Sequence, residues 1–377
     1  MNTFNIKIEK ILSDGRALAH RKDGKVIFVS SVLPEEEVEV EQILEKKDFV
    51  VAKLKKVIQP SSERREPLCE HFGICGGCVF QHCSYQYQLK IKEKIVTEAL
   101  KNKEFSVNIK IIPSKAEWNT RNTALFHIKD GKPCFFKASS HNPVVLNDCP
   151  VLEDGILEKA IKLSKELKDG SSLKVRKDNQ GNIISSIDKE KHNLFEFNNF
   201  KFKVWIKNFF QCNTSLISVW LREIEENLEL NPDDEILDLY SGTGIISIFI
   251  AQKVSNVTGI EIDRSAVKRA IINSTVNGLD KKTYFFAGPV EKMINYIKKT
   301  DAIILNPPRE GANMDTILPK ISELNPSRIV YSSCNFSTFI RDLTSFVKIG
   351  YKLCNITILD MFPQTSHFEV IARLKKI

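Results

Sequence analysis

Short apolar segments alternate with amphipathic ones along the last part of the chain, from about residue 213 onward. The apolar segments have the make-up of buried β-strands, namely EILDLY, NVTGIEI, TYFFAG, AIILN and RIVYSS. The segments that follow them have helical patterns, namely GIISIFIAQKV, RSAVKRAIINSTVNG and FSTFIRDLTSFVKIG. Strands that alternate with helices pair in parallel and are covered on both faces. The sequence therefore predicts a doubly wound, Rossmann-like α/β domain over residues 206–377.

Two regions with other patterns precede this domain, as a length of 377 residues allows. Residues 1–60 alternate apolar and polar positions in short runs, broken by turn signals such as SDGRA and KDGK. This pattern predicts a small β-barrel like the oligonucleotide-binding fold, although a β-domain without a ligand would look the same. The polar linker QPSSERREP follows, and residues 61–205 mix short strands with helical stretches, which predicts a central α+β domain.

The composition is that of a globular protein, with 42% hydrophobic and 27% charged residues. No stretch approaches the ~18 apolar residues of a membrane span or has the form of a secretory signal, so we expect a cytoplasmic protein without a membrane partner. The net charge of +8 permits a polyanionic partner but does not require one. The nine cysteines are expected to be reduced and free to bind metal or react, although most isolated cysteines only pack.

A cofactor site is predicted where the strand EILDLY runs directly into SGTGIISIFI. Glycines between a strand and a helix let the backbone approach a ligand, and the helix N-terminus offers free amide donors. Asp238 lies near the end of that strand, and Glu261 ends the next strand, where a carboxylate can bind a ribose diol. Nicotinamide dinucleotides use the same layout, but GTGIIS lacks their third glycine, which favours S-adenosylmethionine.

Three further polar segments follow predicted strands of this domain, namely LNPPREG, YSSCNF and MFPQTSHFEV. Ligands of open α/β sheets bind beyond the carboxyl ends of the strands, so we expect Asn306 and Cys334 to share one crevice. A thiol there can act as a covalent nucleophile, and the carboxylate of Glu369 can act as a base. A lone cysteine at a strand end is more often a packing residue, so Cys334 by itself would not predict a reaction.

Five segments occur in an order that resembles the RNA uracil-5-methyltransferases, which form 5-methyluridine in ribosomal and transfer RNA. FFQCN is similar to the family's FFQ-x-N, DLYSGTG to its first motif, NPPREG to [DN]-PPR-x-G, SCN to SCNP, and DMFPQTSHFE to DMFP-x-T-x-H-x-E. DGRALAH, GKVIFV and LPEEEVEV resemble the small RNA-binding TRAM domain that is often fused to these enzymes. The resemblance covers nearly the whole chain and implies a class I methyltransferase domain behind a TRAM barrel and a central domain.

The resemblance also implies a role for each matching residue. Cys334 would add to carbon 6 of a uracil so that carbon 5 can take the methyl group, and Glu369 would then remove the proton from carbon 5. Arg309 and His367 would support the pocket or have only structural roles. Contacts to S-adenosylmethionine or to the pyrimidine are implied for Gln211, Asp238, Tyr240, Gly242, Glu261 and Asn306.

Three positions depart from the family pattern. Asn306 stands where many members have aspartate, so it could bond the uracil edge but could not act as a base. Phe336 replaces the proline after the SCN segment, which could shift the start of the next helix. GPVEKM stands where GDAE-like sequences are common, which leaves the adenine contact at that position open.

Four cysteines form a separate candidate site. Cys69, Cys75 and Cys78 have a C-x5-C-x2-C spacing, and Cys149 follows much later in NDCPVL. Four thiolates can hold either a zinc ion or a [4Fe-4S] cluster. Members of the resembled family that carry CGGC and CPV bind a [4Fe-4S] cluster, so the resemblance implies this cofactor in a structural or RNA-positioning role.

RNA is the partner that the resemblance implies. Ribosomal RNA, and 23S rRNA in particular, is favoured because the fused barrel and the cluster are features of ribosomal members. A transfer RNA methyltransferase that modifies the T-loop uridine would share every catalytic residue, and an RNA-binding protein that has lost catalysis would keep the fold. The presence of both Cys334 and Glu369 disfavours the last alternative. A monomer is the default expectation.

Overall fold

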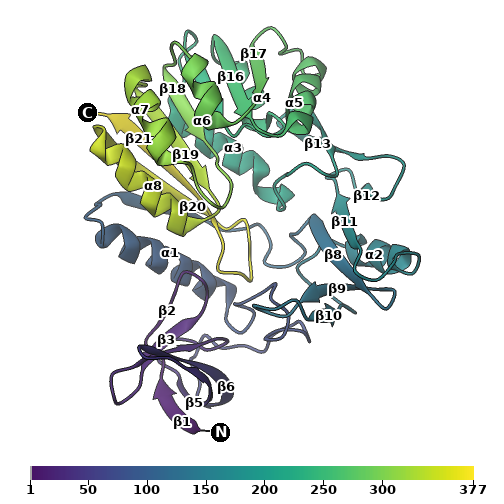
Figure 1. The fold of residues 1–377 in the computed structure, drawn as a ribbon, viewed down its shortest axis with the longest axis vertical. Helices are drawn as coiled ribbons and strands as arrows, with labels where there is room; N and C mark the ends of the chain where they lie inside the picture. The colour runs from purple at the N-terminus through teal and green to yellow at the C-terminus, as the bar shows by residue number, and fades with distance from the viewer. Residues whose placement is uncertain (1) are drawn as a thin grey trace.

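The computed structural model describes residues 2–377, and its N-terminal part is a six-stranded sheet with the order β1-β5-β6-β4-β3-β2 (Figure 1). Alternate residues are buried along the strands, for example Val38 and Val40, so the apolar side chains form one core. A small β-domain therefore begins the chain, as the alternating pattern predicted. Its strands are β1 (Thr3–Lys7), β2 (Lys10–Ile11), β3 (Ala17–His20), β4 (Val26–Val29), β5 (Glu37–Glu45) and β6 (Phe49–Gln59).

A five-stranded antiparallel sheet with the order β10-β9-β8-β11-β12 forms the central part. Helix α2 (Ile156–Ser164) covers one of its faces, where Phe126, Ile156 and Val175 are buried in a common core. This mixture of strands and one helix agrees with the predicted α+β composition. The strands are β8 (Thr123–Lys129), β9 (Lys132–Phe136), β10 (Pro143–Val145), β11 (Ser172–Lys177) and β12 (Ile183–Ser185).

The C-terminal part is an eight-stranded sheet with the order β17-β16-β15-β18-β19-β21-β20-β7. Strands β15 to β19 pair in parallel, whereas β21 is antiparallel to both β19 and β20. The strands are β15 (Glu235–Leu239), β16 (Asn256–Glu261), β17 (Thr283–Ala287), β18 (Ala302–Leu305), β19 (Arg328–Ser333), β20 (Tyr351–Leu359) and β21 (Glu369–Lys376), with β7 (Asn108–Ile112) at the edge.

Helices cover both faces of this sheet, which confirms the predicted doubly wound α/β fold. One face has a core with Trp220, Ile248 and Ile304, and the other has a core with Ile303, Ile317 and Phe339. Ile303 and Ile304 are adjacent and point to opposite faces. The helices are α3 (Thr214–Leu228), α4 (Ile245–Ala251), α5 (Arg264–Val276), α6 (Val290–Met293), α7 (Met314–Leu324) and α8 (Phe336–Lys348), with a 3₁₀ turn η1 (Ile294–Tyr296).

Part of the sequence assigned to the central domain packs with the C-terminal sheet instead. Strand β7 pairs in parallel with β20 and covers an edge that would otherwise be open. Helix α1 (Tyr85–Lys101) contributes Val96 and Leu100 to the core on the same side as α8. The hairpin of β13 (His192–Phe197) and β14 (Phe200–Trp205) shares a core with α3 and α4. In space, residues 61–205 are therefore divided between two bodies.

None of the helices within residues 2–377 combines the length and the apolar character that crossing a bilayer requires.

Candidate active site

The glycine turn after β15 leaves an open space at the carboxyl edge of the sheet, where a cofactor is expected. Gly242 has a φ of +55°, and within residues 2–377 no heavy atom beyond its two chain neighbours lies within 4 Å of where a Cβ would stand. At the end of β15 and in this turn, three buried polar atoms have no hydrogen-bond partner within residues 2–377, namely Oδ1 of Asp238 and the hydroxyls of Tyr240 and Ser241. Buried polar groups are normally paired, so the turn is suited to a ligand with donors and acceptors. The ammonium, carboxylate and ribose groups of S-adenosylmethionine fit that requirement.

Two carboxylates flank this turn. Asp238 is completely buried, and the Ser247 hydroxyl donates to its Oδ2 at 2.5 Å. Burial raises the pKa of Asp238 to about 7, and the charge of Glu261 acts in the same direction. Glu261 accepts the backbone amides of Gly242 at 3.0 Å and Asp263 at 2.8 Å. These bonds fix the Glu261 carboxylate beside the turn and leave lone pairs for ribose hydroxyls.

The reaction side of the crevice is set by the antiparallel register of β19 and β21. Ser333, the last residue of β19, pairs with Val370, so Cys334 and Glu369 are the next residues across the strand pair. Cys334 is half-buried and Glu369 is buried. The predicted thiol and carboxyl groups therefore lie together at the carboxyl edge of the sheet.

Two side chains that the sequence did not single out orient Glu369. The Ser332 hydroxyl donates to Oε1 of Glu369, and the indole Nε1 of Trp220 donates to Ser332 Oγ at 3.0 Å. Because an indole can only donate, the serine proton is directed at the carboxyl group. Ser332 is visible in YSSCNF as a polar residue in a buried strand, but its partner depends on register. Nothing in the sequence singles out Trp220 as a site residue, because it only fits the apolar pattern of a helix.

The surroundings in the crevice shift the pKa values of both Cys334 and Glu369. Burial raises the pKa of the Cys334 thiol to about 11, with a further contribution from the charge of Glu369. The Arg309 guanidinium opposes this rise in the pKa, because a cation beside the thiol stabilises the thiolate. Burial raises the pKa of Glu369 to about 7 against the lowering effect of the Ser332 hydrogen bond. A pKa near neutrality suits a group that must accept a proton.

The FFQCN segment borders the same crevice. Gln211 is buried, whereas the neighbouring Phe209 is 74% exposed. Asn122 fixes this backbone, since its amide donates to the carbonyl of Cys212 at 2.8 Å and its Nδ2 to that of Gln211 at 3.2 Å. Burial raises the pKa of the Cys212 thiol, and the charge of Glu369 acts in the same direction.

The remaining predicted residues lie on loops around these groups. Asn306 is half-buried, and its backbone amide donates to the carbonyl of Leu239 at 3.3 Å, beside the cofactor turn. Arg309 is exposed, and its carbonyl accepts Nδ2 of Asn335 at 2.7 Å, which joins the NPPREG and SCN loops. His367 is exposed on the loop before β21.

Two departures from the family pattern are accommodated locally. Phe336 takes the first position of α8, the position that proline favours, and Asn335 caps the helix by accepting the amide of Ser337 at 3.1 Å. Pro289 of GPVEKM stands directly before α6 and leaves the helix start at Val290.

The four predicted metal ligands, Cys69, Cys75, Cys78 and Cys149, line one cavity away from this crevice. All four are free thiols, and apolar side chains such as Phe72 and Leu146 form part of the wall. Burial raises the pKa of the Cys149 thiol to about 12, with smaller contributions from Cys78 and Cys69. Within residues 2–377, no three His, Cys, Asp or Glu side chains converge tightly enough to hold a single metal ion.

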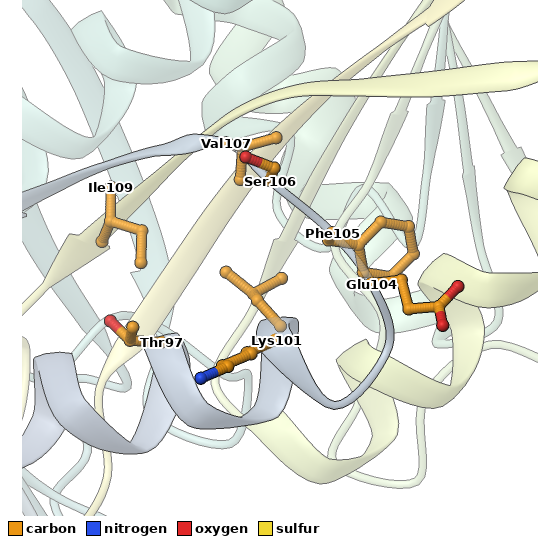
Figure 2. A pocket seen from close by; sticks show the side chains of 8 residues that line it. Thr97, Lys101, Glu104, Phe105, Ser106, Val107 and Ile109 are labelled. Atoms are coloured by element: carbon orange, nitrogen blue, oxygen red, sulfur yellow. The ribbon is translucent and has the colours of Figure 1, made fainter.

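A shallow groove of about 380 Å³ lies between the end of α1 and the chain that enters β7 (Figure 2). Its lining includes Leu100, Phe105 and Val107, with Lys101 and Glu104 as the charged residues. Because β7 runs parallel to the central strands, its first residues lie at the amino edge of the sheet. The groove is therefore on the opposite side of the sheet from the candidate active site.

Comparisons with known proteins agree with this geometry. Residues 292–377 match the family model described as tRNA (Uracil-5-)-methyltransferase, and residues 221–321 match a methyltransferase small domain. A protein of Aliivibrio salmonicida named 23S rRNA (uracil(1939)-C(5))-methyltransferase RlmD is 31% identical, over 100% of this chain and 97% of its own length. An uncharacterised RNA methyltransferase of Thermotoga maritima is 28% identical over 98% of each chain.

A solved structure shares the fold over the whole chain. The Pyrococcus abyssi tRNA (uracil-54, C5)-methyltransferase, in complex with S-adenosyl-L-homocysteine, superimposes with a TM-score of 0.80. It is 23% identical and covers 98% of this chain and 100% of its own. The fold, the crevice and the full-length relatives agree, and the chain belongs to the S-adenosylmethionine-dependent RNA uracil-5-methyltransferases.

Proposed function

We propose that this protein methylates carbon 5 of a uridine in 23S rRNA through a transient covalent bond to Cys334. The observation that carries this proposal is the register of β19 and β21, which brings Cys334 and Glu369 together. A thiol and a carboxyl group in one crevice supply the nucleophile and the base that substitution at carbon 5 requires.

The proposed reaction starts at carbon 6, because carbon 5 of a conjugated uracil is a poor nucleophile. The Cys334 thiolate adds to carbon 6, and the electrons of the C5–C6 double bond move into an enolate. Carbon 5 then takes the methyl group of S-adenosylmethionine, which leaves S-adenosylhomocysteine. Glu369 removes the proton from carbon 5, the double bond forms again, and the C6–S bond breaks to release the thiolate.

Other residues prepare the two reacting groups. Arg309 favours the thiolate of Cys334, which would otherwise be disfavoured by burial. The amide of Asn306 can bond the uracil edge but cannot take a proton, which keeps the role of base on Glu369. We assign binding of S-adenosylmethionine, or alignment of the pyrimidine against it, to Gln211, Asp238, Tyr240, Gly242, Glu261 and Asn306.

Ribosomal RNA is favoured as the substrate by the relatives that match from end to end. Several of them are named 23S rRNA uracil-C5 methyltransferases, and their matches include the N-terminal β-domain and the cysteine segment. The target must be flipped out of its stack for carbon 5 and carbon 6 to be reached. We propose that the N-terminal and central parts hold the RNA while this happens.

A cation-rich surface leads into the FFQCN segment and supports RNA binding. Lys207 Nζ lies 5.4 Å and the Arg269 guanidinium 5.6 Å from the centre of the Trp205 ring. Lys174 donates to the carbonyl of Asn208 at 3.3 Å, and burial lowers its pKa to about 8. A phosphate would offset the cost of burying this cation. We call Trp205, Lys174, Lys207 and Arg269 the Trp205 surface.

We further propose that Cys69, Cys75, Cys78 and Cys149 hold a [4Fe-4S] cluster. The four thiols line one cavity, and four thiolates are the ligand set that such a cluster uses. Burial raises the pKa of the Cys78 thiol, and Arg121, which also lines the cavity, opposes that rise, so its charge would offset that of thiolate ligands. The methyl transfer needs no electron, so the cluster would act by holding these loops together.

The function is tested with 23S rRNA fragments that carry 5-fluorouridine, which cannot lose a proton from carbon 5. The wild-type protein and S-adenosylmethionine should give an adduct that survives denaturation, and Cys334→Ala should give none while still binding the cofactor. Cys212→Ala is the matched control, because this second thiol borders the same crevice and should leave the adduct intact. An adduct in Cys334→Ala would remove Cys334 from the mechanism, and an adduct with tRNA alone would replace ribosomal RNA as the substrate.

The cluster is tested by metal analysis of protein prepared without oxygen. We expect a brown protein with about four iron atoms per chain, as a cubane cluster requires. One zinc ion per chain would contradict the assignment.

A further inference from the structure

The loop that precedes Glu369 is hydrogen-bonded to the residues that directly follow Cys78. This loop, residues 360–368, joins β20 to β21, and Gln364 at its centre is buried with a φ of +67°. The Gln364 carbonyl accepts the amides of Val79 at 2.9 Å and Phe80 at 3.0 Å. These are the two residues directly after Cys78. The end of the cysteine segment therefore holds the loop that leads to the proposed base.

Helix α1 fastens the same loop with side chains. Gln88 and Gln364 form a reciprocal pair, in which Gln88 Nε2 donates to Gln364 Oε1 at 3.0 Å and the Gln364 amide donates to Gln88 Oε1 at 3.0 Å. Lys92, one helical turn further, donates to Oδ1 of Asp360 at 2.5 Å and to the carbonyl of Phe362 at 3.2 Å. Residues four apart on a helix share a face, so α1 directs both polar side chains at this one loop.

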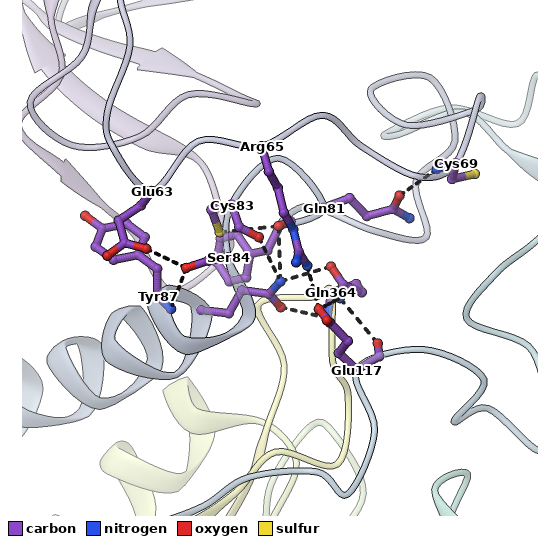
Figure 3. A network of polar contacts seen from close by, with 11 residues as sticks. Glu63, Arg65, Cys69, Gln81, Cys83, Ser84, Tyr87, Glu117 and Gln364 are labelled. Atoms are coloured by element: carbon purple, nitrogen blue, oxygen red, sulfur yellow. Dashed lines mark hydrogen bonds and ion pairs between the residues drawn. The ribbon is translucent and has the colours of Figure 1, made fainter.

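Neighbouring contacts complete the network around Gln364 (Figure 3). Gln364 Nε2 donates to the carbonyl of Glu117 at 3.3 Å, and Arg65 pairs with the Glu117 carboxylate at 2.6 Å. At the other end, Gln81 accepts the amide of Cys69 at 3.0 Å. The segment from Cys69 to Gln81 is thus fixed to itself and to the Gln364 loop by directed hydrogen bonds.

Packing alone does not require these bonds. Gln88, Lys92, Asp360 and Gln364 are all 0% exposed, and a buried ion pair adds little net stability because desolvation offsets its attraction. Apolar side chains would join α1 to the loop as firmly, but hydrogen bonds have direction and fix one arrangement. Glu369 follows Gln364 by five positions and is the first residue of β21, so the loop that these bonds fix leads directly to the proposed base.

We infer that Gln88 and Gln364 are positioning residues for Glu369, and that the cysteine segment acts on product release through them. The inference rests on the proposed role of Glu369 as the base. A displaced base would slow proton removal from carbon 5 and leave the earlier methyl transfer intact. Methylated RNA would then remain bound to Cys334.

The test is Gln88→Met, which keeps an unbranched side chain of similar volume and removes both hydrogen bonds. In single turnover with uridine RNA, methyl transfer should stay within about threefold of wild type, and release of methylated RNA should slow by about 10- to 100-fold, as for a base misplaced by about 1 Å. A denaturation-resistant complex should accumulate. Gln88→Glu, which keeps an acceptor for the Gln364 amide, should accumulate less of it.

The matched control is Asp234→Asn, which removes the negative charge from a buried ion pair with Arg328, 2.8 Å long, at the amino edge of the sheet. It should lower thermal stability without accumulating the complex. The inference is overturned if Gln88→Met slows both steps equally, or if Asp234→Asn accumulates as much complex. Glu369→Gln separates the two proposals: a complex with Glu369→Gln but not with Gln88→Met refutes only the inference, whereas free release from Glu369→Gln refutes the proposed base as well.

A separate experiment tests whether the cysteine segment holds the Gln364 loop. Cys78→Ser should speed hydrogen exchange at the amides of Val79, Phe80 and Gln364 by more than about tenfold and should also accumulate the complex. Cys354→Ser, a half-buried cysteine outside the cavity, should do neither. Unchanged exchange in Cys78→Ser would show that the cysteine segment does not hold the loop.

Discussion

The catalytic crevice and the four-cysteine cavity are built in different ways. In the crevice, Tyr240, Asn306 and Cys334 each follow the end of a strand of one sheet, so strand register sets their positions. In the cavity, most lining residues, including all four cysteines, come from loops far apart in the chain. The crevice should therefore keep its shape when a reacting group is replaced. The shape of the cavity should depend on the cluster that we propose for its thiols.

Among the substitutions that distinguish the crevice from the cavity, we expect the largest effect, a loss of cofactor affinity, at Gly242. Gly242→Val would put a branched side chain into the open space beside the turn, so S-adenosylmethionine affinity should fall by more than about 100-fold, or about 2.7 kcal/mol. The measurement is calorimetric titration with the cofactor. Gly24→Val is the control, because Gly24 also has a positive φ, of +87°, and open space, but lies in the N-terminal domain. Affinity within threefold of wild type in Gly242→Val would remove the turn from the cofactor site.

The next effect is expected in the cavity. Cys149→Ser should release the loops, so that amides in residues 69–83 and 146–153 exchange hydrogen about 30-fold faster, a local loss of about 2 kcal/mol. Binding of S-adenosylmethionine should stay within about twofold, because the cofactor turn belongs to the sheet. Mass-spectrometric hydrogen exchange on the wild type, the variant and Cys354→Ser would measure this. A large loss of cofactor affinity in Cys149→Ser would show that the two regions are one unit.

The same contrast explains what the sequence could predict. Strand ends of an α/β sheet are visible as apolar runs followed by polar residues, so the amino-acid pattern alone could predict a shared crevice for Asn306 and Cys334 and a cofactor turn beside Asp238 and Glu261. The pairing of Ser332 with Glu369 could not be predicted, because it depends on the register of two strands that are far apart in sequence.

The domain boundaries were harder to predict for a related reason. The pattern VNIKII predicts a strand, but it does not name the sheet, because the partner is whichever edge lies free in the folded chain. Strand β7 pairs with β20 in the C-terminal sheet, although it lies within residues 61–205. The cysteine spacing likewise indicates candidate ligands, but it could not predict the bonds from Val79 and Phe80 to Gln364.

We expect pH to have a smaller effect, which acts on the rate at which methylated RNA is released. Burial raises the pKa of Glu369 to about 7, and only the ionised carboxylate can accept the proton from carbon 5. Release of methylated RNA should therefore be about tenfold slower at pH 6 than above pH 8, and the covalent complex should accumulate on the acid side. Rapid-quench analysis of wild-type protein across this range would show it. A release rate that does not change between pH 6 and pH 8 would contradict the assignment of Glu369 as base.

We expect the smallest effect on RNA affinity. It tests whether the RNA backbone crosses the Trp205 surface. Lys207 is exposed, and its Nζ lies 5.4 Å from the centre of the Trp205 ring, so Lys207→Met should remove one phosphate contact from the Trp205 surface. The slope of log affinity against log salt should fall by about 1, and affinity should drop about threefold at moderate salt. Lys298→Met is the control, since this exposed lysine precedes β18 at the amino edge of the sheet. Equal slopes for the two variants would mean that the RNA does not cross the Trp205 surface, and the N-terminal β-domain and the cysteine loops would then carry the backbone contacts.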